Sequence, residues 1–485
     1  MEENTIAVGL DIGTTKIVAM IGRANEYGKL EILGVGKSRS LGVHRGVVNN
    51  ITQTINSIRK AVEEAELDSG LDISEVVVGI AGQHIRSIQH SDYITRKDSE
   101  KVIEENDVNQ LCDQVHKLVM LPGEEIIHVL PQEFKVDGQP DVDEPVGMYG
   151  VRLEANFHVV VGQISSIRNI GRCVKSAGLD LSGVTLQPLA SANATLSKEE
   201  KEAGVALIDI GGGTTDLAIF KDGIIRHTAV IPFGGNVITE DIKEGCSIIE
   251  KQAELLKIKF GSAWPGENKD NEIVSIPGLR GREPKEITLK NLSKIIHYRV
   301  VEIIEDVFLE IKNYGYEEQK KKLIGGIVVT GGGSQLKHLK QLIEYITGMD
   351  TRIGYPNEHL AGNTNKDVKE PLFATAVGLV LNSLEKIDKA RLEREAEIKT
   401  IQEPEEKIEV EEKPLNRIVD ESVNEEVETE TVTEAEVEVE EQTAPEVDSR
   451  YRRNIFDKWF EKFKEFLDNA ECKQCCKIKK IKNKE

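Results

Sequence analysis

Residues 205–220, VALIDIGGGTTDLAIF, are two apolar runs rich in β-branched residues on either side of a glycine–threonine turn. Such runs joined by a short polar turn are typical of a β-hairpin. Residues 5–22, TIAVGLDIGTTKIVAMIG, repeat the pattern near the N-terminus, with Asp-Ile-Gly again followed by Thr-Thr. Two copies of one strand–turn–strand unit predict a duplicated α/β fold.

The two turns, together with a third at residues 331–334, are candidates for phosphate binding. Glycine lets the backbone approach a ligand closely. Successive amides and threonine hydroxyls can then surround phosphate oxygens as an anion nest, and Lys16 can neutralise a terminal phosphate. The candidate nucleotide-binding residues are Asp11, Gly13, Thr14, Thr15, Lys16, Asp209, Gly211, Gly212, Gly213, Thr214, Thr215, Gly331, Gly332, Gly333 and Ser334.

Asp11 and Asp209 each end an apolar strand beside one of these turns. Two carboxylates suit a hydrated Mg2+ ion, which keeps its waters and takes few protein ligands. Any one of these turns is equally compatible with an ordinary hairpin, and the duplication is what favours a phosphate site. Neither a P-loop nor a strand–GxGxxG–helix unit occurs. We therefore expect the phosphates between the two hairpins, with the third turn and its helix against the adenosine.

The pattern resembles the actin/hexokinase/heat-shock-chaperone ATPase superfamily and, within it, the bacterial cell division family FtsA. Residues 10–16 and 207–217 are similar to its two phosphate motifs, 328–336 to its adenosine motif, and 185–194 and 374–379 to its connecting segments. FtsA is favoured by the sequence RGVV at 45–48, by VVVGIAGQHIRS at 76–87 and by an insert that follows. The resemblance covers residues 4–390.

The resemblance implies function as well as fold. It implies an ATP and Mg2+ site, binding to the tubulin-like protein FtsZ, self-association into filaments, and contacts with later division proteins. It also implies a location at the division septum, on the inner face of the cytoplasmic membrane. Two alternatives stay open: a carbohydrate kinase of the same superfamily, and a pilus-assembly actin homologue.

The predicted fold class is α/β, a duplicated actin-like ATPase fold with a small α+β insert in the first half. A disordered acidic linker and a C-terminal amphipathic helix are expected after it. The predicted boundaries are 1–83 for the opening segment of the first half, 84–162 for an FtsA-type SHS2 insert, 163–192 for the return of the first half, 193–370 for the second half with an FtsZ-contacting subdomain near 237–300, 371–390 for a closing helix, 391–448 for the linker and 449–485 for the helix and basic tail.

Gln187 stands near the place where the superfamily carries its hydrolytic residue. The superfamily's sugar kinases place a base Asp near the first connecting segment, and bacterial actins often have Glu before its proline. Here Gln187 precedes Pro188, and residues 183–196 contain no acid. Glutamine can orient a water molecule but cannot act as a general base. We expect at most weak ATPase activity.

Charge is distributed unevenly along the chain. The total is −22, whereas residues 391–448 carry 22 Asp/Glu against 6 Lys/Arg, and residues 449–485 carry 12 Lys/Arg against 6 Asp/Glu. The acidic linker has too few large apolar groups to form a core. A net negative chain argues against nucleic acid as the main partner. Cys472, Cys475 and Cys476 contain one Cys-x-x-Cys, a weak signal for zinc.

The C-terminal segment has the pattern of an interfacial membrane helix. Its bulky apolar residues recur at helical spacing: Ile455, Phe456, Trp459, Phe460, Phe463, Phe466 and Leu467. Lys and Arg on both sides would attract anionic lipids, and aromatic residues on one face with charge on the other are what such a helix requires. The alternative is a helix that docks on the protein body.

Overall fold

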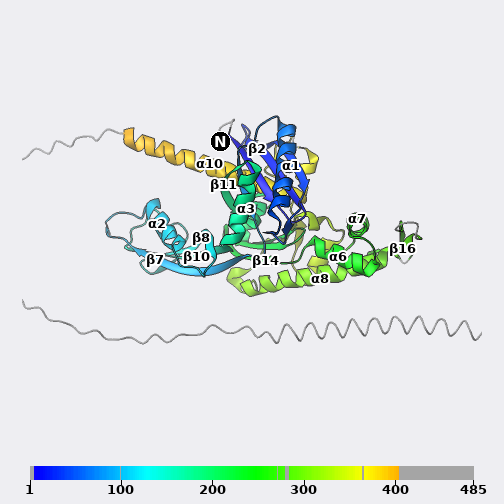
Figure 1. Cartoon of the computed structure of the whole chain (residues 1–485). Coiled ribbons are helices and arrows are strands. Elements are labelled where there is room, and N and C mark those ends of the chain that lie inside the picture. Colours follow the sequence, from blue (N-terminus) through cyan, green and yellow to red (C-terminus); the bar gives the residue numbers. More distant parts are fainter. Residues whose placement is uncertain (1–4, 99, 270, 279–282, 363–364, 403–485) are drawn as a thin grey trace, which may run out of the picture. The chain divides into compact units, whose positions relative to one another are not determined.

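The computed structural model describes residues 5–402, apart from 99, 270, 279–282 and 363–364 (Figure 1). The first half is built on a five-stranded sheet in the order β11-β6-β1-β2-β3. Its strands are β1 (Ile6–Ile12), β2 (Lys16–Ala24), β3 (Leu30–Arg39), β6 (Glu75–Ile80) and β11 (Asp180–Leu186). Because strand side chains alternate between faces, Leu10 and Ile17 join one core cluster, and Val18 and Met20 join another.

Helices cover both faces of this sheet. Helices α1 (Ile51–Ser69) and α3 (Ile164–Ala177) supply Ile58 and Val174 to the first cluster. Helix α10 (Ala374–Gln402) supplies Val377 and Val380 to the second. Helix α4 (Gln187–Thr195) packs against α10 and reaches both halves.

The second half repeats the arrangement in a sheet of order β14-β13-β12-β17-β18. Its strands are β12 (Val205–Ile210), β13 (Thr215–Lys221), β14 (Ile224–Ile231), β17 (Ile327–Thr330) and β18 (Thr351–Ile353). In each half the first hairpin strand is antiparallel to its partner and parallel to a third strand: β1 with β2 and β6, β12 with β13 and β17. The duplicated α/β fold predicted from the sequence is confirmed.

One face of the second sheet carries the larger core. The helices there are α6 (Gly235–Cys246), α7 (Glu250–Phe260), α8 (Leu289–Tyr314) and α9 (Leu339–Thr347). The remaining small elements of this half are α5 (Lys198–Ala203), β15 (Ile273–Ile276) and β16 (Lys285–Thr288), with 3-10 turns η1 (Pro265–Glu267), η3 (Gln319–Lys321), η4 (Gly332–Gln335), η5 (Lys366–Lys369) and η6 (Pro371–Phe373). Turn η6 leads directly into α10.

The insert is a separate sheet of order β7-β10-β8-β9 with one helix. It consists of β7 (Ile85–Thr95), α2 (Glu105–His116), β8 (Glu124–Val136), β9 (Gln139–Val142) and β10 (Arg152–Gln163), and the short hairpin β4 (Val43–His44) and β5 (Val47–Val48) precedes it in the chain. Its own core includes Leu111 and Phe157. Side chains of the insert cap β14, the edge strand of the second sheet: Gln132 Nε2 donates to the carbonyl of Ile225 at 2.6 Å, and Ser87 Oγ to that of Thr228 at 2.9 Å.

In the insert, α2 begins at Glu105, where Glu104 and Asp107 form a capping box. Two sequence expectations were wrong. The helix expected directly after the third glycine turn begins at Leu339, because His338 adopts a left-handed backbone (φ 61°) that interrupts it. The linker expected to be disordered from 391 is still helical up to Gln402, since its Leu, Glu, Arg and Ala residues are strong helix formers.

The remaining predicted boundaries stay predictions. The rest of the linker, the amphipathic helix and the three clustered cysteines lie outside the described residues. Among the residues that are described, no helix is both long and apolar enough to cross a bilayer.

Candidate functional site

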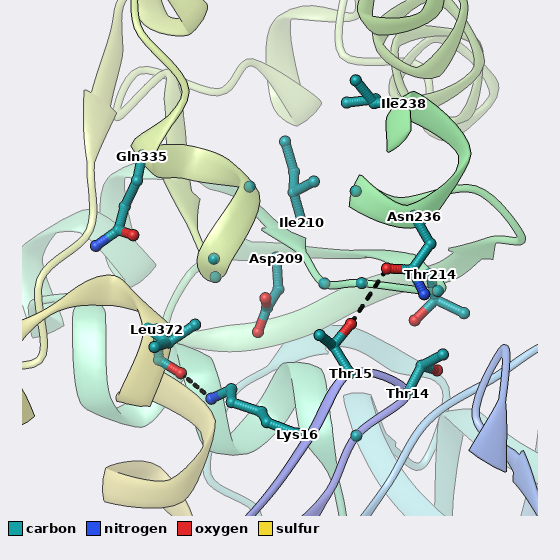
Figure 2. Close-up of a pocket in the computed structure, with 18 of the residues that line it drawn as sticks. Thr14, Thr15, Lys16, Asp209, Ile210, Thr214, Asn236, Ile238, Gln335 and Leu372 are labelled. Carbon is teal, nitrogen blue, oxygen red and sulfur yellow. Dashed lines mark hydrogen bonds between the residues drawn. The ribbon is translucent and has the colours of Figure 1, made fainter. Parts of the chain in front are cut away.

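A cavity of about 640 Å3 lies where the two hairpin turns meet the third glycine turn (Figure 2). Of the residues predicted to bind nucleotide, the following line it: Asp11, Gly13, Thr14, Thr15, Lys16, Asp209, Gly211, Gly212, Gly213, Thr214, Gly331, Gly332 and Gly333. Thr215 and Ser334 do not, because their hydroxyls donate to the carbonyls of Phe233 (2.9 Å) and Gly331 (2.7 Å).

The two hairpin turns touch each other across the boundary between the halves. An added Cβ on Gly212 would collide with Thr15, and one on Gly213 would collide with Thr14. Figure 2 shows Thr15 Oγ1 donating to Asn236 Oδ1 of α6, at 3.3 Å. Only glycine lets the backbone of the second turn approach the Thr14 and Thr15 side chains this closely, so these glycines build a narrow cradle that is lined by amides and hydroxyls.

Lys16 is the cation at the base of the cavity. Its Nζ donates to the carbonyl of Leu372, as Figure 2 shows, and lies 3.9 Å from Asp11 Oδ2. The ammonium is also 5.1 Å from the centre of the Phe373 ring. Burial lowers the pKa of Lys16, and the charge of Asp11 opposes that shift. A buried ammonium with so few partners can exchange the Leu372 carbonyl for an anionic ligand.

Asp11 and Asp209 are the acids near the ends of the first hairpin strands, one from each half. Burial raises the pKa of both carboxyls, and the charge of Lys16 opposes that shift at each. Within the described part of the chain, no group of three or more His, Cys, Asp and Glu side chains is arranged to hold a metal directly. Two separate acids are instead suited to a cation that keeps its own waters.

The chain was compared with family models and with known proteins. A family model described as "Cell division protein FtsA" matches residues 206–378, and one described as "SHS2 domain inserted in FTSA" matches residues 82–161. The FtsA proteins of Pseudomonas aeruginosa and Borreliella burgdorferi are 38% and 40% identical to this chain over 386 and 382 residues. These alignments cover 80% and 79% of this chain and 91% of each relative. The chain belongs to the FtsA family.

As a member of the FtsA family, this chain has a role in cell division. The resemblance seen in the sequence, the actin-like fold class and the SHS2 insert are confirmed. A solved structure of the "PilM-PilN type IV pilus biogenesis complex" is similar in fold, with a TM-score of 0.56 at 16% identity, covering 78% of this chain and 98% of that one. The pilus-assembly alternative therefore shares the fold, whereas the family is FtsA.

Gln187 contacts protein atoms through its amide nitrogen in this FtsA-family structure. The sequence led us to expect an amide that orients water. Its Nε2 instead donates to Asp11 Oδ1 at 2.9 Å and to the carbonyl of Gly79 at 3.3 Å. Both amide protons are thus directed at protein atoms, and only the side-chain carbonyl is left for a water molecule.

Asp216 is a site residue that the sequence reasoning missed. It lines the same cavity, is 4% exposed, and receives a hydrogen bond on Oδ2 from Thr214 Oγ1 at 3.2 Å. Its Oδ1 is buried without a hydrogen-bond partner within the described residues. Burial, with a smaller contribution from Asp209, raises the pKa of Asp216 to about 8.

Helix α7 contributes a charged pair that was also missed. Lys257 Nζ is 2.7 Å from Glu254 Oε2, and it also donates to the Gly235 carbonyl (2.8 Å) and to Thr239 Oγ1 (2.7 Å). Both Glu254 and Lys257 line the cavity. The available signal was a Glu-x-x-Lys in a predicted helix, since residues three apart share a helix face.

Proposed function

We propose that this protein is an ATP-binding, actin-like adaptor that holds the FtsZ ring on the inner face of the cytoplasmic membrane at the division septum. The observation that carries the proposal is the meeting of two duplicated turns, one from each half, around a single cavity. A ligand bound there contacts both halves at once, so binding favours the closed arrangement over the open one. Such a ligand would control self-association.

ATP with Mg2+ fits the residues of this cavity. The backbone of Gly211, Gly212 and Gly213 and the hydroxyls of Thr14 and Thr214 would hold phosphate. Lys16 would exchange the Leu372 carbonyl for the terminal phosphate. Asp11 and Asp209 would hold Mg2+ through its waters. Bound Mg2+ would neutralise phosphate charge in a site where burial already disfavours three ionised carboxylates.

The third turn and α7 would receive the nucleoside. Residues 331–333 would face the adenosine, and the Glu254–Lys257 pair has the polarity that ribose hydroxyls require, one acceptor and one donor. We propose slow turnover, because Gln187 cannot take a proton and a carboxyl with a pKa of about 8 is mostly protonated at neutral pH. A turnover number near the enzyme median of about 10 per second would contradict this.

The adaptor role assigns tasks to the other regions. The subdomain near 237–300 would contact FtsZ, and the insert over 84–162 would mediate filament contacts and later division partners. The linker would space the body from the membrane. The C-terminal helix would insert its apolar face, including Trp459 and Phe460, into the interface, while the basic tail attracts anionic lipids. A carbohydrate kinase would need a base that Gln187 does not supply.

Co-sedimentation with FtsZ on anionic liposomes tests the adaptor role. The full chain should carry FtsZ down with the vesicles, and the chain lacking residues 449–485 should bind FtsZ without the vesicles. Trp459→Glu with Phe460→Glu should also abolish flotation, because burying each aromatic side chain is worth roughly 1.5–3 kcal/mol. ATP binding by the double variant is the control for folding. Retained flotation of the double variant would remove the membrane helix from the proposal.

A further inference from the structure

Helix α4 contacts Asp11 and Asp209 from a single face. Gln187 is its first residue, and Ser191 follows one turn later, at the spacing that places two side chains side by side. Gln187 Nε2 donates to Asp11 Oδ1 at 2.9 Å, and Ser191 Oγ donates to Asp209 Oδ2 at 2.6 Å. Asp11 belongs to the first half and Asp209 to the second, so one helix connects the carboxylates of both.

The position of α4 is itself closely fixed. Ala190 packs with Val77 of the first sheet, and Ala192 packs with the core around Leu207 of the second. Helix α10 approaches its backbone so closely that a Cβ on Gly378 would collide with the carbonyl of Ala190. A helix packed on both sheets and held against α10 at backbone distance cannot shift without moving one of its neighbours, so side chains on it have defined positions.

Helix α10 supplies a second hydroxyl to the same acid. Thr375 Oγ1 lies 3.3 Å from Asp209 Oδ2 and 3.0 Å from Ser191 Oγ. Each acid thus has one oxygen engaged by neutral donors. The other oxygens differ in surroundings: Asp11 Oδ2 is near the Lys16 ammonium, and Asp209 Oδ1 lies against Gly331, where a Cβ would collide with it. Engaging one oxygen fixes the rotation of a carboxylate about its terminal bond.

We propose that Gln187 and Ser191, together with Thr375, are positioning residues that set the orientation of Asp11 and Asp209 toward one hydrated divalent cation. This inference rests on the proposed Mg-ATP site. Neutral donors suit the task because they fix a carboxylate and leave its charge for the cation. Partners of groups that ligate a metal directly typically contribute 10–100-fold to metal affinity. Here water lies between each acid and the cation, so we expect an effect at the low end of that range. The glutamine is thus required by Asp11 and need not touch the substrate.

The test compares ATP affinity of the full chain by calorimetry, with Mg2+ and with EDTA. The variants are Ser191→Ala with Thr375→Val, which removes both hydroxyls from Asp209, and Gln187→Met, which removes the donor from Asp11 at similar size. We expect the gain in ATP affinity due to Mg2+ to fall about tenfold in each, more than any change in metal-free affinity. Thr375→Ser alone, which keeps the hydroxyl, should retain the gain.

Thr347→Val is the matched control, because it removes a buried hydroxyl that donates to the Ile343 carbonyl of α9. Equal losses with and without Mg2+ would mean a general structural effect and would overturn the inference. The inference would also be overturned if Mg2+ raised the ATP affinity of both variants as much as it raises that of the parent chain. If the parent chain itself binds ATP equally well with EDTA, the proposed magnesium site fails, and the positioning role falls with it.

Discussion

The two hairpin turns are copies of one backbone unit that differ in two respects. Both read Asp-Ile-Gly and then Thr-Thr, but the second has two extra glycines, Gly212 and Gly213. The residue after Thr-Thr is Lys16 in the first turn and Asp216 in the second. Equivalent places in the repeat thus carry opposite charges, and both side chains line one cavity.

This difference separates what a repeated backbone provides from what single side chains provide. The repeat brings two strand ends and their acids to one point. The extra glycines let the second turn lie against Thr14 and Thr15 of the first. Burial then acts on the two charges in opposite senses: it lowers the pKa of Lys16 and raises that of Asp216. In both copies burial disfavours the charged form, and only the charge of the first copy, a cation, has the sign that attracts phosphate.

Replacing Gly212 should break the contact between the turns and have the largest effect. In Gly212→Val a branched side chain would occupy the space of Thr15, and the halves would have to separate. We expect nucleotide affinity to fall about 100-fold or more, since forcing extra carbons into a packed site costs about 1–3 kcal/mol or more. Calorimetry with Mg-ATP measures it. Gly171→Ala, in α3, is the control, because its Cβ would meet only Leu181 at 3.8 Å.

Removing the cation of the first turn should have the next largest effect. Lys16→Ala should weaken Mg-ATP binding roughly tenfold to a hundredfold, because a charge-assisted hydrogen bond contributes about 1.5–3 kcal/mol. Lys37→Ala is the matched control, since Lys37 is an exposed lysine on the same cavity that also faces Phe373. If Lys37→Ala loses as much Mg-ATP affinity as Lys16→Ala, Lys16 binds the nucleotide no more specifically than an exposed lysine of the same cavity.

Neutralising Asp216 should change how stability depends on pH. Its pKa of about 8 in the folded state lies above the ordinary value of 3.8. The folded state therefore keeps a proton that the unfolded state has lost, and the free energy of unfolding falls as pH rises from about 4 to 8. Asp216→Asn should abolish this loss, so its advantage over the parent should grow by on the order of 1 kcal/mol per pH unit.

Urea unfolding of the nucleotide-free chain at pH 5, 6 and 7 measures this advantage. Asp180→Asn, at an exposed carboxylate of β11, is the control and should show no such trend. A constant difference between Asp216→Asn and the parent across this range would mean that Asp216 is ionised in the folded protein. The second turn would then carry a negative charge beside the phosphates.

Single residues show which parts of the fold and of the site could be predicted from the sequence. The Asp-Ile-Gly and Thr-Thr repeat predicted which backbone segments meet, because local pattern determines hairpins. Asp216 was missed because it reads as the first residue of a strand. Its burial depends on segments distant in the sequence, since its face of β13 packs with α4 and Asp11 of the first half lies near it. Strand β7 was missed because its sequence, IRSIQHSDYIT, has too few apolar residues to show a clear alternation. Several of its polar side chains contact β14 instead. The partner of Gln187 depends on how α4 crosses between the halves, which no local pattern contains.

Exchanging Gln187 for Glu sharpens the comparison between the two acids, with the smallest expected effect. Asp11 of the first copy is held by an amide at 2.9 Å, and Asp209 of the second by hydroxyls. Gln187→Glu would place a second carboxyl against Asp11, whose pKa burial already raises. Like charges disfavour ionisation of both. Without nucleotide, we expect the free energy of unfolding to fall by about 1 kcal/mol at pH 7.5, and by less at pH 5, where a protonated Glu can itself donate to Asp11.

Gln187→Met, which adds no charge, should show a loss that does not depend on pH. Mg2+ should reduce the loss in Gln187→Glu, because a cation between two carboxylates removes their repulsion. A Gln187→Glu variant as stable as the parent at pH 7.5 would mean that this side chain faces solvent, the arrangement that a water-orienting glutamine requires.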